Sequence, residues 1–139
     1  MGIFNNKKLI SLIFFGSVPL ILIGYIFHSY EIIYIFRNLK IIAWTTLLFG
    51  ILLYYADKRP ELKKINKNLN LINILIIGLF QVLALIPGVS RSGIVITASR
   101  IYNFERVEAA KISFFLSIPA LSGASFLGIK NVLDVNLEI

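Results

Sequence analysis

The fold of this chain is decided by one heptapeptide, Pro87-Gly88-Val89-Ser90-Arg91-Ser92-Gly93. Long apolar runs lie on both sides of it, Leu69–Ile86 before and Ile94–Ile101 after. A guanidinium between two hydroxyls, in the middle of so many apolar residues, is energetically costly and usually faces a partner or a cavity. We therefore expect Arg91 to have a partner.

The residues of the heptapeptide predict a break between two helices. Pro87 removes a backbone donor and disfavours helical geometry at the residue before it, so it ends the incoming helix. Gly88 and Gly93 permit a positive φ or a close approach to the backbone. Ser90 or Ser92 can cap the helix that restarts near Gly93 and leave amide groups aimed at the loop. A helix N-terminus beside an arginine fork is an anion site that phosphate oxygens fit well.

The heptapeptide has two other interpretations. The simpler one is a helix break with capping serines and an arginine that snorkels to an interface. The second, a nucleotide-binding P-loop, is excluded. Gly88 and Gly93 have the glycine spacing of a P-loop, but Ile94 and Val95 stand where that motif needs Lys and Ser or Thr.

The composition indicates an integral membrane protein. Of the 139 residues 58% are hydrophobic and only 15% are charged, and the mean hydropathy is +0.84. A soluble domain of this length carries far more charge. The net charge of +7 then indicates basic cytoplasmic loops and contact with anionic lipid, not with nucleic acid. The chain has no cysteine, which excludes disulfides and thiolate metal sites.

Three apolar segments are long enough to cross the hydrocarbon core as helices: Leu9–Phe27, Ile41–Ala56 and Ile112–Ile129. Of the two segments that flank the heptapeptide, Leu69–Ile86 could nearly span, whereas Ile94–Ile101 is too short at roughly 1.5 Å per residue. Such a pair predicts a re-entrant hairpin or a broken helix, whose irregular backbone survives at depth only beside a cavity or inside protein. The expected fold class is all-α: a polytopic membrane protein with about three transmembrane helices and one re-entrant or broken helix pair.

The charged loops predict the orientation. The loop Asp57–Asn70 carries five basic residues against two acidic ones, so the positive-inside rule places it in the cytoplasm. Lys7 and Lys8, two spans earlier, fall on the same side. The connector Arg100–Lys111 is amphipathic and charged, and we expect it to be solvated.

Carboxylates are absent from the apolar segments. All seven acidic residues fall in predicted loops or chain ends: Glu31, Asp57, Glu61, Glu105, Glu108, Asp134 and Glu138. A divalent cation at membrane depth needs hard oxygen ligands, usually carboxylates, so these segments predict no metal site. The polar candidates near the heptapeptide are Gln81, Ser90, Arg91, Ser92, Thr97 and Ser99. They can bind an anion but include no carboxylate or histidine to act as a base, so they form half of a site.

The segment Ile77–Gly93, Ile-Gly-Leu-Phe-Gln-Val-Leu-Ala-Leu-Ile-Pro-Gly-Val-Ser-Arg-Ser-Gly, resembles the undecaprenyl pyrophosphate phosphatase family of the bacitracin-resistance (BacA/UppP) type. The similarity continues through Glu108–Ala120 and, more loosely, through Gly16–Pro19. Members of that family look like two interlocked inverted repeats, each with a re-entrant hairpin that carries half of the site. The resemblance implies that residues 1–139 form a single membrane domain, a fragment corresponding to the second repeat, without the first repeat and the last helices.

The resemblance implies hydrolysis of undecaprenyl pyrophosphate to undecaprenyl phosphate and inorganic phosphate, which recycles the lipid carrier for cell-wall synthesis. Arg91 would clamp the pyrophosphate, and amides around Ser90–Gly93 would stabilise charge on the departing phosphate. Ser90 would bind phosphate or act as the nucleophile, and Ser92 is either a cap or a ligand. The implied catalytic residues are Arg91 and Ser90. The implied substrate-binding residues are Gly88, Ser90, Arg91, Ser92, Gly93 and Gln81.

The resemblance also implies a divalent cation, Mg²⁺ or Ca²⁺, whose ligands are absent from this chain. Gln81 and Leu85, one turn apart, look like the counterparts of an acidic pair that the family's first repeat supplies. One residue departs from the family pattern, because Val95 stands where Thr is usual. Thr97 faces nearly the other way on a helix and is not a simple replacement.

We expect this chain to be inactive by itself and to lie in the bacterial cytoplasmic membrane as a multi-pass protein. Its expected partners are undecaprenyl pyrophosphate, membrane lipid, and either a first-repeat polypeptide or further copies of itself in a homo-oligomer, with no nucleic acid. Two alternatives stay open. One is half of an inverted-repeat lipid or anion transporter with the same broken-helix site. The other is a non-functional truncated fragment.

Overall fold

The computed structural model describes residues 7–30 and 38–137, and its regular secondary structure in these ranges is helical. The elements in chain order are α1 (Lys7–Tyr30), α2 (Leu39–Asp57), α3 (Ile65–Asn68), α4 (Leu71–Gln81), the 3-10 helix η2 (Val82–Leu85), α5 (Arg91–Ile101) and α6 (Arg106–Leu137). Within the described ranges three helices, α1, α2 and α6, are long and apolar enough to cross a membrane. The predicted all-α class with three spans is therefore confirmed.

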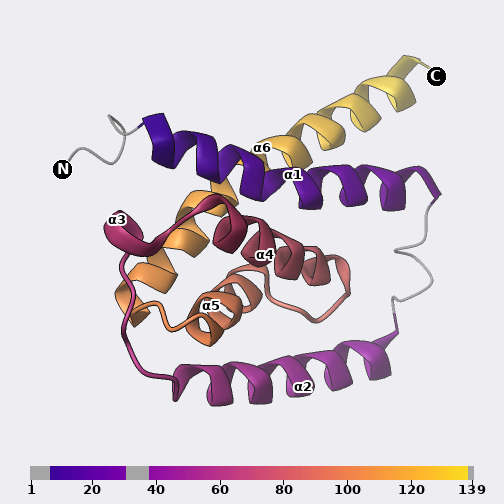
Figure 1. Ribbon diagram of the computed structural model, residues 1–139. Helices are drawn as coiled ribbons and strands as arrows, with labels where there is room; N and C mark the ends of the chain where they lie inside the picture. The colour runs from indigo at the N-terminus through magenta and orange to yellow at the C-terminus, as the bar shows by residue number, and fades with distance from the viewer. Residues whose placement is uncertain (1–6, 31–37, 138–139) are drawn as a thin grey trace.

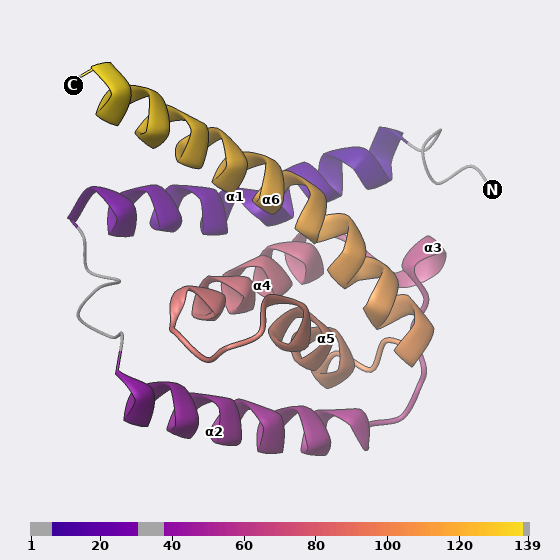
Figure 2. The same cartoon turned by 180° about the vertical axis from the view of Figure 1, so that it is seen from behind.

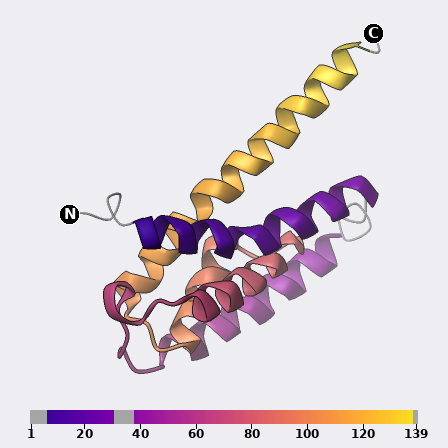
Figure 3. The same cartoon turned by 45° about the horizontal axis from the view of Figure 1, so that its top comes forward.

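The three long helices surround the short pair α4 and α5 (Figure 1). Helix α1 packs on α4, α2 packs on α5, and α6 packs on both α5 and α1. From behind, α6 crosses α1 and continues beside α5 (Figure 2). The C-terminal half of α6 extends beyond the other helices (Figure 3). The helix runs through Pro119 and continues to Leu137, beyond the predicted end at Ile129.

Both ends of the α4–α5 pair are held at the same end of the molecule. The segment before α4 and the turn after α5 are joined by backbone hydrogen bonds. Lys63 N donates to Asn103 O (3.0 Å), and Glu105 N donates to Lys63 O (3.0 Å). A hairpin whose two ends meet in this way enters and leaves on one side of the helix bundle. The geometry is that of the predicted re-entrant pair.

The first arm of this hairpin changes from an α-helix to a 3-10 helix before the proline. The α-helix ends at Gln81, and η2 carries the chain on to Leu85. Ile86 then has extended backbone, with φ −73° and ψ 127°, as is typical of a residue before proline. Pro87 therefore ends the helical arm as predicted, but only after the last turn has become a 3-10 helix.

Helices α1 and α4 approach each other closely at two glycines. A methyl group at Gly78 would overlap the backbone oxygen of Gly16. Because protein interiors are close-packed, a larger residue at either position would push the helices apart. The apolar core beside this contact includes Ile74, Ile77, Ala98, Phe104 and Leu116.

The connector after α5 differs from the predicted solvated segment. Arg100 is fully buried, and its guanidinium donates to three backbone oxygens, those of Asp57, Arg59 and Phe104. Glu108 accepts a hydrogen bond of 2.9 Å from the backbone amide of the first residue of α3. The prediction was wrong for these two residues because helix ends leave backbone groups without partners, and charged side chains satisfy them here.

Candidate anion site

The heptapeptide forms the turn from η2 into α5, and Ser90 caps that helix. Ser90 has extended backbone, and its Oγ accepts a hydrogen bond from Gly93 N (3.2 Å). Of the two serines that were candidates for the cap, Ser90 is therefore the one in that role. The Oγ of Ser92 lies 3.3 Å from the Oγ of Ser90, so the two hydroxyls share a hydrogen bond. The amides of Arg91 and Ser92 stand in the first turn, where an α-helix offers them no acceptor.

The two glycines of the heptapeptide serve different purposes. Gly88 has a φ of +93°, in the left-handed region that favours glycine. Gly93 is helical, and a methyl group there would lie 3.1 Å from the Cβ of Ser90. Glycine at this position therefore leaves room for the Ser90 side chain to fold over the start of α5 and cap it.

The turn is supported from α2 by two residues that the sequence does not indicate. Thr45 Oγ1 lies 2.6 Å from Pro87 O, and Thr46 Oγ1 lies 3.0 Å from Gly88 O. A threonine in a helix commonly bonds the carbonyl of the preceding turn, and both of these also lie within reach of one. The sequence alone therefore does not distinguish these two threonines from others that bond only to their own helix.

Arg91 lines a groove of about 540 Å³ together with residues of α1 and α6. Its Nε is buried without a hydrogen-bond partner in the described part of the chain. Lys130 lines the same groove, and none of the lining residues is acidic. The walls are mostly apolar or small, and include Leu20, Ile21, Gly24, Ala120, Gly123 and Ala124. A groove with two cations and no carboxylate on its walls attracts an anion with an apolar part.

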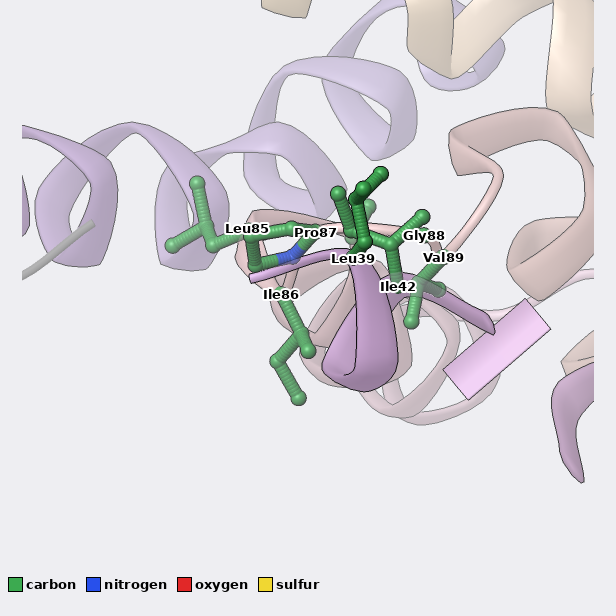
Figure 4. Close-up of a pocket in the computed structure, with 8 residues that line it drawn as sticks. Leu39, Ile42, Leu85, Ile86, Pro87, Gly88 and Val89 are labelled. Atoms are coloured by element: carbon green, nitrogen blue, oxygen red, sulfur yellow. The ribbon is translucent and has the colours of Figure 1, made fainter. Parts of the chain in front are cut away.

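Ser90 lines a different hollow, of about 170 Å³, with Thr46 and Phe49 of α2 and Thr97 of α5. A third hollow of about 470 Å³ lies beside the turn itself. Figure 4 shows its lining, with two residues of α2 against Leu85–Val89, and every side chain there is apolar. The side chains of Ser90 and Arg91 therefore line separate spaces, although both belong to the start of α5.

Gln81 lies apart from these spaces. It is fully buried at the end of α4, and neither Oε1 nor Nε2 has a hydrogen-bond partner in the described part of the chain. A buried polar group without a partner costs roughly 1–3 kcal/mol. Gln81 does not line the hollows around Ser90 and Arg91, and its role in substrate binding stays a prediction.

The other hydroxyls of α5 bond to the helix itself. Thr97 Oγ1 donates to Gly93 O (2.7 Å), and Ser99 Oγ donates to Val95 O (2.8 Å). Val95 is buried in the core, whereas Thr97 lines the hollow that also contains Ser90. A hydroxyl at position 97 therefore lies on the Ser90 side of α5.

The described residues do not fit a divalent cation. They contain no group of three or more His, Asp or Glu that could hold a metal ion. Glu31 and Glu138 lie outside the described residues. At the start of α5 the available groups are hydroxyls, amides and a guanidinium, which suit an anion and repel a cation.

The chain is similar to known proteins over nearly its whole length. The family model described as Bacitracin resistance protein BacA matches residues 4–138. The undecaprenyl-diphosphatase of Pelagibacter ubique (strain HTCC1062) is 55% identical over 136 residues, which cover 97% of this chain and 53% of that protein. The undecaprenyl-diphosphatases of Elusimicrobium minutum (strain Pei191) and Alteromonas mediterranea are 43% and 40% identical over 95% of this chain, and are covered to 51% and 49%. The chain thus spans about half the length of the curated relatives it matches.

Proposed function

The chain belongs to the bacitracin resistance protein BacA family, and on this basis we propose that it supplies the pyrophosphate-binding half of an undecaprenyl-diphosphatase. The substrate is undecaprenyl pyrophosphate, and the products are undecaprenyl phosphate and inorganic phosphate. The chain acts as a multi-pass protein of the bacterial cytoplasmic membrane, where the lipid carrier is reused for cell-wall synthesis. The other catalytic groups come from a second polypeptide or a second copy.

The environment of Arg91 is the observation that supports this proposal most directly. Its Nε is buried without a partner, and it lines an apolar groove that also contains Lys130 and no acidic residue. Arg91 as a whole is half-buried, and a partly desolvated guanidinium in an apolar groove favours an anionic ligand. A lipid pyrophosphate matches both parts of the groove, because its anionic end suits the cations and its prenyl chain suits the apolar walls.

In this proposal the start of α5 binds the pyrophosphate. The planar Arg91 fork binds two phosphate oxygens at once, and the amides of the first turn bind another. As the bond between the two phosphates breaks, negative charge grows on the departing phosphate, and these fixed donors stabilise it without reorganising. The groove between α1 and α6 holds the first isoprene units and keeps water from the anionic end.

Ser90 is assigned to phosphate binding. Its Oγ accepts from Gly93 N, so its single proton remains available for a phosphate oxygen or for the Oγ of Ser92. A serine nucleophile needs a base within hydrogen-bond reach. The described residues that line the Ser90 hollow include no carboxylate, histidine or lysine. A nucleophilic role for Ser90 would therefore require a base from outside the described chain.

If a divalent cation takes part in the reaction, its ligands come from residues other than those described for this chain. Because the residues at the start of α5 suit an anion, we assign no step of this chain to a metal ion. Carboxylate ligands would come from the second polypeptide. This division leaves binding and orientation of the pyrophosphate to this chain and activation of the attacking oxygen to the partner.

Phosphate release from undecaprenyl pyrophosphate tests the proposal. The 139-residue chain is produced together with the N-terminal half of the Pelagibacter ubique relative and assayed in detergent, with the chain alone as reference. Arg91→Gln should lower kcat/KM roughly 100-fold, as expected for loss of a charge-stabilising donor. Lys67→Gln removes the same charge at an exposed position on α3 and should stay within about twofold of the unchanged chain.

Two outcomes would contradict the proposal. Phosphate release by Arg91→Gln at the unchanged rate would remove Arg91 from the site. Movement of the lipid pyrophosphate across a vesicle membrane without phosphate release would instead favour an inverted-repeat transporter.

A further inference from the structure

The turn that leads into α5 is held by a helix 42 residues earlier in the chain. Thr45 Oγ1 lies 2.6 Å from Pro87 O, and Thr46 Oγ1 lies 3.0 Å from Gly88 O. We infer that Thr45 and Thr46 are positioning residues, which fix this turn and so aim the start of α5 at the pyrophosphate. The inference rests on the proposed function, because it concerns the same anion site.

The proton of each hydroxyl can go to only one oxygen at a time. Thr45 Oγ1 has three oxygens within reach, and Pro87 O is the nearest of them, since the two oxygens of its own helix lie at 2.9 and 3.0 Å. Thr46 Oγ1 is nearer to Ile42 O (2.7 Å) than to Gly88 O. Thr45 therefore makes the stronger contact with the turn, and Thr46 shares its proton between the turn and α2.

The two carbonyl groups of the turn need these donors. Within the described residues, no backbone amide donates to Pro87 O or Gly88 O. The turn lies beside the first two turns of α2, a helix long enough to cross the membrane. A backbone carbonyl that packs against a neighbouring helix without a donor is costly.

Gly88 brings the turn as close to α2 as a residue permits. A methyl group at this position would overlap Thr45 Oγ1 and would lie 2.6 Å from Ile42 O. The positive φ of Gly88 and the threonine hydroxyl are therefore matched features of one contact. Ser90, the N-cap of α5, follows Gly88 by two residues. A displacement of Gly88 from α2 would therefore rotate the cap and the first amides of α5.

The hydrogen bond can be observed directly, because Pro-Gly occurs once in the chain. Proline labelled with ¹³C at the carbonyl and glycine labelled with ¹⁵N give one bonded ¹³C–¹⁵N pair, at Pro87–Gly88. The full chain is placed in lipid nanodiscs, and the carbonyl shift is read by nuclear magnetic resonance. Loss of a hydrogen bond moves a carbonyl signal upfield. Thr45→Val should produce this shift, and Thr45→Ser, which keeps the hydroxyl, should not.

The same samples are titrated with inorganic pyrophosphate, with the glycine amide signals as the readout. Thr45→Val should weaken binding roughly threefold to tenfold, the effect of one hydrogen bond, while Thr45→Ser should bind as the unchanged chain does. An unchanged Pro87 carbonyl shift in Thr45→Val would overturn the inference. Equal weakening by Val and Ser would also overturn it, because packing and not the hydroxyl would then be responsible.

Arg91→Gln separates this inference from the proposed function. Unchanged pyrophosphate binding by Arg91→Gln would count against the anion site, while the Pro87 shift would still decide whether Thr45 holds the turn. If Thr45→Val does not fold, Thr46→Val provides the comparison at the second contact. Gly-Val also occurs once, at Gly88–Val89, so ¹³C-glycine and ¹⁵N-valine report that carbonyl alone.

Discussion

The Nη2 of Arg100 donates a hydrogen bond of 2.9 Å to the backbone oxygen of Asp57, which joins the last turn of α5 to the last residue of α2. The Nε of Arg100 also lies 3.6 Å from Asp57 Oδ1. Since this guanidinium is fully buried, these protein groups replace the water that the charge would otherwise need. Helix α2 holds the turn, and α5 begins at it. Their C-terminal ends, away from the turn, are thus fixed to each other.

Arg100→Lys should lower the free energy of unfolding by about 2–4 kcal/mol. A lysine keeps the charge but cannot serve three backbone oxygens as a planar fork does, and buried polar groups would lose partners. Arg106→Lys is the matched control. Arg106 also pairs with Asp57, but it is exposed, so its replacement should cost less than about 1 kcal/mol. Reversible unfolding in mixed micelles measures both variants, and equal losses would contradict a special role for the buried arginine.

Gly78→Ala and Gly50→Ala should change stability in opposite directions. A methyl group at Gly78 would overlap a backbone oxygen of α1, so we expect a loss of about 1–3 kcal/mol as the helices separate. Gly50 lies in α2 with nothing within 4 Å of an added methyl group. There alanine should stabilise the helix by up to about 1 kcal/mol. The melting temperatures of the two variants provide the comparison, and a stabilised Gly78→Ala would show that the α1–α4 contact is looser than described.

The spans and the break between α4 and α5 were predictable because each depends on local features. Apolar length alone sets whether a helix can cross a membrane, and Pro87 ends a helical arm whatever packs beside it. The capping role was predictable only as a choice between two serines. Which serine caps depends on the residue at which α5 begins, and the sequence allows more than one start.

Contacts between distant segments explain what the sequence did not predict. Arg91 and Arg100 look alike in the sequence, since one lies just before the segment Ile94–Ile101 and the other lies near its end. Arg100 is buried because the end of α2 and the following loop bring three backbone oxygens to it, and nothing in its own neighbourhood indicates this. The support of the turn by Thr45 and Thr46 depends in the same way on two segments far apart in sequence.

Cysteine labelling on intact cells should place the two ends of α2 on opposite sides of the membrane. The chain has no cysteine of its own, so single cysteines at Leu39 and Lys67 give a clean signal. The basic loop after α2 should be cytoplasmic by the positive-inside rule. An impermeant maleimide should therefore label Leu39→Cys and not Lys67→Cys. The reverse pattern would invert the predicted orientation and place the start of α2 in the cytoplasm.

Alanine substitutions at Ser90 and Ser92 test the capping role of Ser90 through stability. Ser90→Ala removes the acceptor of the Gly93 amide and should cost about 1 kcal/mol of stability. Ser92→Ala removes no cap and should cost less than about 0.5 kcal/mol. Thermal unfolding of both variants in the same detergent makes the comparison, and equal stability would contradict the Ser90 cap.

Ser90→Asp provides the complementary test. A carboxylate accepts the Gly93 amide and is favoured at a helix N-terminus, so this variant should be as stable as the unchanged chain. Its negative charge occupies the place where the proposed site binds a phosphate, so the affinity for inorganic pyrophosphate should fall at least tenfold through like-charge repulsion. Ser90→Ala, by contrast, keeps Arg91 and the amides and should lose only a fewfold in affinity. If Ser90→Asp were both stable and unimpaired in pyrophosphate binding, the anion would have to bind elsewhere on the molecule, because no phosphate could share the first turn of α5 with a carboxylate without a measurable loss.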